Sequence, residues 1–171
     1  TSSAPPGPPS ATDLDPADFF HILSANVGSI PAKWDVITKW GADALALQEA
    51  KLDHQETGTY GALAHAAGMQ MRAGRPLPNR QTNGGVAILS RAPTPLHSAG
   101  PFHLWEEHIL YERSRWVAAS APVGNGQHRV LIENAYGFSG ERKDDKDCPV
   151  AAANREHLEM LFRIGASRGP D

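Results

Sequence analysis

Asn26 and Glu49 are the residues best placed to do chemistry, because each follows a short apolar run with the length of a β-strand. A carboxylate or amide is costly to bury without a partner, so both side chains are expected where their strands emerge into a cleft. Carboxylate and amide oxygens bind hard cations such as Mg²⁺, and an amide also donates hydrogen bonds to phosphate oxygens. The two positions therefore predict a site for a metal ion or a phosphate group at strand ends.

Four segments of the sequence resemble, in the same order, segments of the endonuclease/exonuclease/phosphatase family. They are the Asn-Val pair at 26–27, the Leu-Gln-Glu segment at 47–51, the Gly-Gly strand at 84–91 and the Asn-x-Tyr strand at 130–137. Each segment alone is a weak signal. Four of them in order make a more specific match.

The resemblance implies a domain that hydrolyses phosphodiester or phosphomonoester bonds with a divalent metal, Mg²⁺ or Mn²⁺. It implies that Glu49 is a metal ligand and that Asn26 contacts both metal and substrate. Tyr136 and Asn134 correspond to residues beside the phosphate and are the expected catalytic residues. Arg115 looks like the arginine that opens a strand in relatives, and it is expected to bind substrate.

Each of these residues also has a plain structural interpretation. Glu49 could be a solvated side chain at the start of a loop, and Asn26 could close a strand and begin a turn. Tyr136 could pack at a strand end with its hydroxyl in water, and Asn134 could end a strand ladder. Arg115 could lie at the solvent end of its strand.

Two segments expected in a complete member of this family do not occur in the sequence, a Gly-Asp-x-Asn strand end and a Ser-Asp-His segment. In the family, these segments contribute the groups that activate water. We therefore interpret residues 19–171 as the N-terminal portion of such a domain, which a C-terminal half would complete. The expected substrate is nucleic acid, cleaved by an endonuclease of the retroelement-like kind, with other phosphate esters as the alternative. The rival hypothesis is a noncatalytic remnant or interaction module that retains the half-fold.

Composition is that of a globular chain, with 40% hydrophobic residues among 171. The formal net charge of −3 argues against a broadly cationic surface for nucleic acid but leaves room for a local one. No apolar run reaches the roughly 18 residues of a membrane-spanning helix. Cys148 is the single cysteine, which fits an intracellular protein of the nucleus or cytoplasm. The Pro- and Ser-rich residues 1–18 are expected to be a disordered leader.

Strand and helix patterns alternate along the chain, which predicts a layered α/β fold. The resemblance implies that this fold is an incomplete sheet-and-helix sandwich of the type that the family adopts. Strands are expected at 19–25, 43–48, 84–91, 116–122 and 129–136. Helices are expected at 32–40, 59–67 and 150–165, with Pro31 at the start of the first. The last two strands form a hairpin around 123–127, while prolines between 93 and 101 indicate irregular structure or an edge strand. The charged run 141–147 is expected to be a solvated loop.

Overall fold

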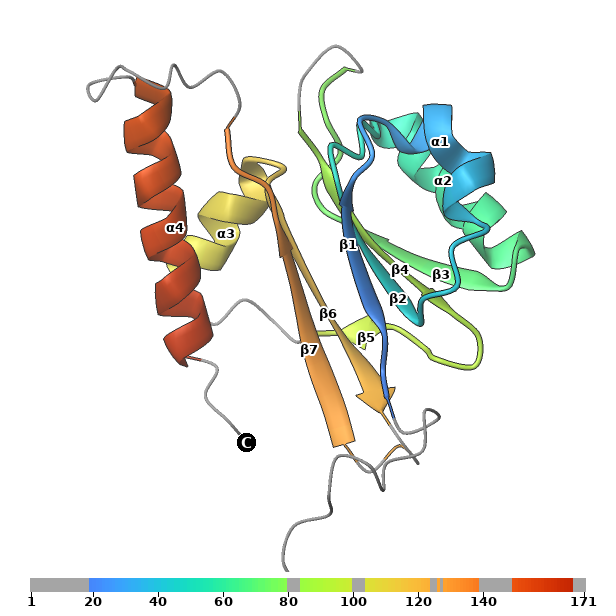
Figure 1. Cartoon of the computed structure of the whole chain (residues 1–171). Helices are drawn as coiled ribbons and strands as arrows, with labels where there is room; N and C mark the ends of the chain where they lie inside the picture. The colour runs from blue at the N-terminus through green and yellow to red at the C-terminus, as the bar shows by residue number, and fades with distance from the viewer. Residues whose placement is uncertain are drawn as a thin grey trace, which may run out of the picture.

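The computed structural model describes residues 19–79, 84–99, 104–123, 126, 128–138 and 149–167. Two β-sheets pack face to face, and a pair of helices lies on each outer side (Figure 1). This layered arrangement confirms the predicted α/β sandwich. The expected leader 1–18, the charged run 141–147 and Cys148 lie outside the described residues.

The first sheet has the strand order β1-β2-β4-β3. β1 (Ile22–Asn26) and β2 (Ala44–Gln48) are parallel neighbours, and their register pairs Asn26 with Gln48. Every residue of β2 except the last is buried, as its continuous apolar run predicts. Because the two strands end together, Glu49 leaves the sheet beside Asn26.

β4 (Val86–Arg91) lies antiparallel between β2 and β3 (Met69–Ala73). The β4 strand begins after the two glycines, as predicted, and it is buried along almost its whole length. β3 was not predicted. Its sequence, Met-Gln-Met-Arg-Ala, contains residues that favour helices, so its pairing with β4 decides its conformation.

Helices α1 (Ile30–Ile37) and α2 (His54–Ala66) cover the outer face of the first sheet (Figure 1). Pro31 stands in the first turn of α1, as predicted. α2 begins earlier than predicted because Asp53 and Glu56 form a reciprocal capping box, in which each side chain accepts a hydrogen bond from the other residue's backbone N–H.

The second sheet is antiparallel, in the order β5-β6-β7. β6 (Trp116–Val123) and β7 (His128–Ala135) pair along their whole length, which confirms the predicted hairpin. Most of the expected turn between them lies outside the described residues. β5 (His97–Ser98) is a two-residue edge strand in the proline-containing region.

Helices α3 (Trp105–Glu112) and α4 (Pro149–Ser167) lie on the outer side of the second sheet (Figure 1). α4 confirms the predicted helix at 150–165, whereas α3 was not predicted. Both helices pack on β6 through a small core of buried residues: Leu110, Trp116, Met160 and Ile164. None of the described helices has the length and apolar character needed to span a membrane.

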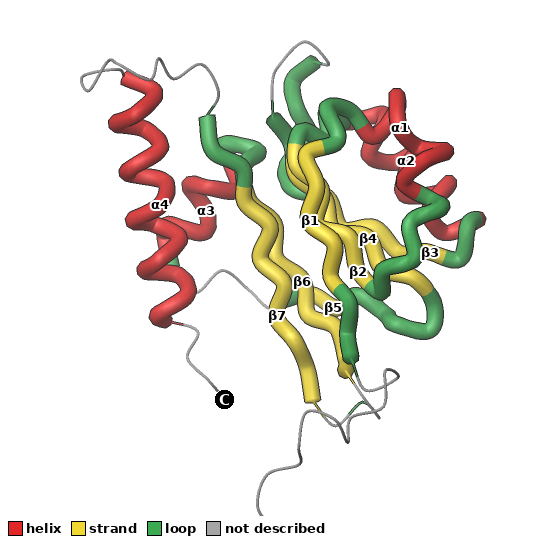
Figure 2. The backbone as a smooth tube through the Cα atoms, in the orientation of Figure 1, coloured by secondary structure: helices red, strands yellow, loops and turns green. Residues whose placement is uncertain are grey.

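The second sheet does not cover the whole inner face of the first (Figure 2). β7 packs over β2 and β4, and β6 packs over β4 and β3. β1 and β7 are thus the outermost strands on the same side of the sandwich. Ile22 and Leu23 point to opposite faces of β1, yet they are 45% and 38% exposed. Neither face of β1 is fully covered.

Candidate active site

Glu49 sits in a tight turn directly after β2. Glu49 and Lys51 have φ angles of +52° and +50°, a left-handed conformation that is uncommon for residues other than glycine. The turn is fixed against the start of β4, because the N–H of Ala50 donates to the carbonyl of Gly85 at 3.0 Å and that of Lys51 to Gly84 at 3.2 Å. Backbone strain of this kind is often found at functional sites.

Three strand ends from both sheets meet at the Glu49 carboxylate. The hydroxyl of Tyr136, which follows β7, donates a hydrogen bond to Glu49 Oε1. The side chain of Asn26, at the end of β1, lies near enough to this carboxylate to help lower its pKa. The structure therefore brings together the expected metal ligand, the expected metal and substrate contact, and one expected catalytic residue.

These contacts lower the pKa of Glu49 below its ordinary value. The largest cause is the hydrogen bond from Tyr136, opposed by partial burial and reinforced by Asn26 and by the positive charges of Lys51 and Arg115. Glu49 is therefore ionised at neutral pH, and the ionised form is the one that binds a cation.

Asn26 combines both interpretations drawn from its sequence. Its Oδ1 accepts a hydrogen bond from the N–H of Gly28 at 3.1 Å, which is the Asn-initiated turn expected before a glycine. Its side chain also reaches the Glu49 carboxylate. The turn therefore orients the amide beside the candidate ligand while Asn26 itself stays exposed.

Arg115 is buried, at 8% exposure, and does not lie at the solvent end of its strand. Its Nη1 donates to the carbonyl of Gly137 at 2.6 Å, and its guanidinium lies 5.1 Å from the ring centre of Tyr136 and 4.6 Å from that of Phe138. Burial lowers the pKa of Arg115, while attraction to Tyr136 and Glu49 opposes that change. Arg115 thus places a positive charge behind the site.

Asn134 lies beneath the site and connects the two sheets. Its Nδ2 donates to the carbonyls of Leu47 and Ala87, each at 2.9 Å, and its Oδ1 accepts from Gln48 Nε2 at 2.8 Å. Both N–H groups and the oxygen of this buried amide are engaged inside the protein. Asn134 thus connects β7, which presents Tyr136, to β2, which presents Glu49, and to β4.

Gln48, Gly84 and Gly85 belong to the sequence motifs described above, but the sequence alone predicted no role for them. Gln48 also donates to Ser24 Oγ at 3.1 Å, so it links β1 to Asn134. Gly84 has a φ of +130°, and a Cβ atom there would lie 3.1 Å from Arg115 Cζ. The polar residue closing a buried strand and the paired glycines were the available signals.

Enzymes of the family that the sequence resembles generally depend on divalent metals, so Mg²⁺ is the ion that these oxygen donors would be expected to hold. Within the described ranges, no three His, Cys, Asp or Glu side chains gather where they could hold a metal ion. Mg²⁺ is often bound by only one or two carboxylates and keeps water and substrate phosphate as further ligands. Ionised Glu49, with Asn26 beside it, fits one part of such a site.

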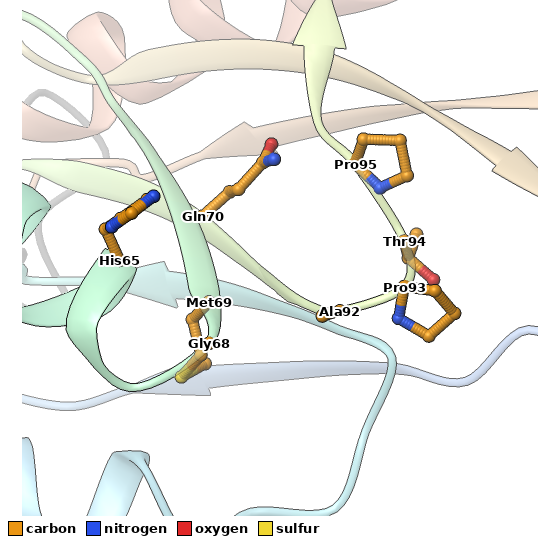
Figure 3. Close-up of a pocket in the computed structure, with 8 residues that line it drawn as sticks. All are labelled: His65, Gly68, Met69, Gln70, Ala92, Pro93, Thr94 and Pro95. Atoms are coloured by element: carbon orange, nitrogen blue, oxygen red, sulfur yellow. The ribbon is translucent and has the colours of Figure 1, made fainter.

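Two hollows flank the first sheet. One of about 210 Å³ lies between the start of β3 and the segment after β4, at the end of the sheet opposite Glu49 (Figure 3). Its lining is mostly apolar. The other, of about 440 Å³, is an open groove that lies toward the Glu49 end, between Asp53–Gln55 and Arg75–Pro78. Only the second is placed to extend the candidate site.

Comparison with known proteins defines the family. The sequence model of the endonuclease/exonuclease/phosphatase family matches residues 23–149, and the chain belongs to this family. The expectation drawn from the four motifs is therefore confirmed. No curated protein matches the sequence.

Solved structures share the fold. The 3'-5' exonuclease NExo from Neisseria meningitidis has a TM-score of 0.57 and 22% identity, covering 86% of this chain and 52% of its own. The APE2 catalytic domain from Xenopus laevis has a TM-score of 0.58 and 16% identity, with 82% and 51% covered. The AP endonuclease LMAP from Leishmania major has a TM-score of 0.56 and 14% identity, and the match covers 91% of this chain and 51% of LMAP. The chain thus spans about half the length of these structures.

Proposed function

We propose that this chain is the N-terminal portion of a divalent-metal-dependent phosphodiester hydrolase of the endonuclease type. One observation carries the proposal: an ionised carboxylate, Glu49, is held by Tyr136, with Asn26 beside it, where three strands from both sheets end. A strained backbone turn presents this carboxylate, and a buried amide network fixes the strands beneath it.

In this proposal, Glu49 binds Mg²⁺ or Mn²⁺ and Asn26 contacts the ion's ligands or the substrate. A bound ion supplies positive charge that stabilises the phosphate in the transition state. Tyr136 has one O–H and gives it to Glu49 here, so it orients the carboxylate. Donation of that O–H to a phosphate oxygen is the role that the family resemblance implies. Arg115 adds positive charge behind both residues.

Asn134, expected to be catalytic, has a different role in this proposal. Its amide is buried and fully used within the protein, so it positions β7 against β2 and does not touch substrate. Arg115, similarly buried, holds the segment that carries Tyr136 through the Gly137 carbonyl. Its contact with substrate would require a phosphate to approach close to Glu49.

Nucleic acid is the substrate that we propose, with other phosphate esters as the alternative. One structure of similar fold, the 3' phosphatase NExo from Neisseria, is bound to a product DNA hairpin. The net charge of −3 provides no general attraction to a polyanion. Binding would therefore depend on local groups, namely the proposed metal with Lys51 and Arg115 beside it.

The site is one-sided, which supports a completing half. The chain spans about half of the structures that it resembles, and among the described residues no three His, Cys, Asp or Glu side chains gather around a metal site. We propose that further polypeptide supplies the groups that activate water, and that it adds strands at the edges β1 and β7. The same one-sidedness favours the rival function, a noncatalytic interaction module, for the chain by itself.

The experiment compares the chain alone with the chain extended by the polypeptide that its neighbouring coding sequence specifies. We expect negligible Mg²⁺-dependent nicking of plasmid or abasic duplex DNA by the chain alone. The extended protein should nick DNA, and Glu49→Gln should reduce its rate by about 100-fold or more, since even residues behind the metal ligands often cost 10–100-fold. A matched substitution on the outer surface, Val36→Gln, should leave the rate unchanged. Nicking that survives Glu49→Gln would contradict the proposal.

A further inference from the structure

Side chains of helix α4 contact the segment 136–138, which carries Tyr136. Asn154, in the second turn of this helix, accepts a hydrogen bond from the N–H of Phe138 at 2.6 Å through Oδ1. Its Nδ2 donates to the carbonyl of the same residue at 3.0 Å. The amide therefore satisfies both backbone groups of Phe138, as a neighbouring β-strand would do.

The close approach of Asn154 explains the glycine between Tyr136 and Phe138. A Cβ atom on Gly137 would lie 2.8 Å from Asn154 Oδ1, a distance that real Cβ contacts do not show. One helical turn beyond Asn154, the ring of His157 packs edge-on against Phe138, with ring centres 6.1 Å apart. The segment is thus held from α4 by both a hydrogen-bonded pair and a ring contact.

Arg115, which directly precedes β6, holds the same three residues. It donates to the Gly137 carbonyl and packs over the rings of Tyr136 and Phe138. Tyr136 in turn donates a hydrogen bond to Glu49. A continuous set of contacts therefore connects Asn154 on an outer helix to the carboxylate of the candidate site.

We propose that Asn154 is a positioning residue that fixes the Tyr136 hydroxyl on Glu49, an inference that rests on the function proposed above. Its place in the helix supports this role. Asn is a poor residue inside a helix because its side chain competes for backbone groups, and here it satisfies the backbone of a separate segment. No sequence motif pointed to Asn154, because its partner lies sixteen residues away across the fold.

The test follows the hydrogen bond between Tyr136 and Glu49 through the tyrosine. The chain has three tyrosines, so ¹³Cζ-tyrosine labelling gives three NMR signals, and Tyr136→Phe identifies the one from Tyr136. At neutral pH, the chemical shift of the Tyr136 signal reports the hydrogen bond that its hydroxyl donates to Glu49. Glu49→Gln, which removes the charged acceptor, should shift that signal.

Asn154→Ala should move the Tyr136 signal toward its position in Glu49→Gln, because a loosened Tyr136 donates less well to the carboxylate. Gly137→Ala should shift it in the same direction by pushing Asn154 away. Asn154→Asp, which keeps the acceptor but loses the donor, offers an isosteric variant if the alanine variant does not fold. The control is Arg163→Ala, a substitution on the same helix as Asn154. It breaks the ion pair of Arg163 Nε with Glu106 Oε1 of α3, at 3.1 Å, and does not touch the segment that carries Tyr136.

Arg163→Ala should leave the Tyr136 signal in place even if it lowers the melting temperature. An unchanged Tyr136 signal in the folded Asn154 and Gly137 variants, or an equal shift in the Arg163 variant, would overturn the inference. The readout needs neither metal nor cleavage. A failure of the proposed hydrolase function therefore shows in the nicking assay and leaves this NMR comparison to decide the role of Asn154.

Discussion

At the scale of single residues, the site depends on groups that do not enter it. Glu49, Tyr136 and Asn26 meet at the surface, while Asn134 below them engages both N–H groups and its oxygen in holding β7 against β2 and β4. Removing this buried amide would leave the backbone carbonyls that it binds without a hydrogen-bond donor, which is costly. The geometry of the site should therefore be as sensitive to Asn134 as to its own members.

Asn134→Ala should lower the free energy of unfolding by about 1–3 kcal/mol, because the carbonyls of Leu47 and Ala87 lose their donor in a buried setting. Urea denaturation followed by circular dichroism measures the change. Arg129→Ala, at an exposed position on the same strand, serves as the control and should stay within about 0.5 kcal/mol of the unmodified chain. A loss no larger than that of the control would show that the network carries little stability.

The sequence predicted which residues form the site better than it predicted how they interact. Glu49 and Asn26 could be predicted from the sequence, because polar residues that end apolar strands must lie where the strands leave the core. The hydrogen bond between Tyr136 and Glu49 joins residues 87 positions apart, so only the packing of two sheets creates it. The buried position of Arg115 has the same origin, since rings and a carbonyl from the segment after β7 surround it.

At the scale of elements, strands with continuous apolar runs were predictable and the short mixed ones were not. β2 and β4 read clearly because both are buried along nearly all their length. β3 consists of residues that favour helices and becomes a strand by pairing with β4. α3 has eight residues, and Trp105 at its start is 70% exposed, so no clean apolar stripe marks it.

α4 carries a titratable group in an unusual setting. His157 is 2% exposed, and neither ring nitrogen has a hydrogen-bond partner in the described structure. Burial lowers its pKa, the positive charges of Arg115 and Arg113 lower it further, and Glu156 opposes them. The folded protein therefore binds a proton at His157 less readily than the unfolded chain does.

The free energy of unfolding should consequently fall as pH drops below about 6.5, where His157 of the unfolded chain gains its proton before that of the folded chain. His157→Leu should weaken this dependence between about pH 6.5 and the lower folded pKa. His128→Leu, on the exposed start of β7, should leave it unchanged. Urea denaturation at a series of pH values measures both. Equal slopes for the unmodified chain and His157→Leu would contradict the account.

At the scale of the whole molecule, the sandwich is open along one side. β1 and β7 are outermost strands on that side, and they carry the exposed apolar residues Ile22, Leu23 and Leu131, at 45%, 38% and 38% exposure. Unpaired edges with apolar side chains favour association with other strands. The candidate site lies at one end of this side, where β1 ends at Asn26. A second half would thus complete the sheets and the site together.

The isolated chain should bind a hydrophobic dye such as anilinonaphthalene sulfonate or self-associate. Combining Ile22→Lys with Leu131→Lys should lower dye fluorescence and favour the monomer, because charged residues on edge strands discourage pairing. Val36→Lys replaces a residue that is 51% exposed on α1 and should have no such effect. A monomeric unmodified chain that binds no dye would argue against an open side. Equal effects of the double variant and of Val36→Lys would argue against it as well.

The presentation of Glu49 to a divalent ion is the claim on which the proposed function depends. Mn²⁺ added to the ¹⁵N-labelled chain tests it directly, because the bound paramagnetic ion broadens NMR signals of nearby residues. The signals of Asn26, Glu49 and Tyr136 should broaden at lower Mn²⁺ concentrations than that of Gly68 at the far end of the sheet, and Glu49→Gln should abolish the difference. Uniform broadening, or selective broadening that persists in Glu49→Gln, would contradict a metal site at this carboxylate.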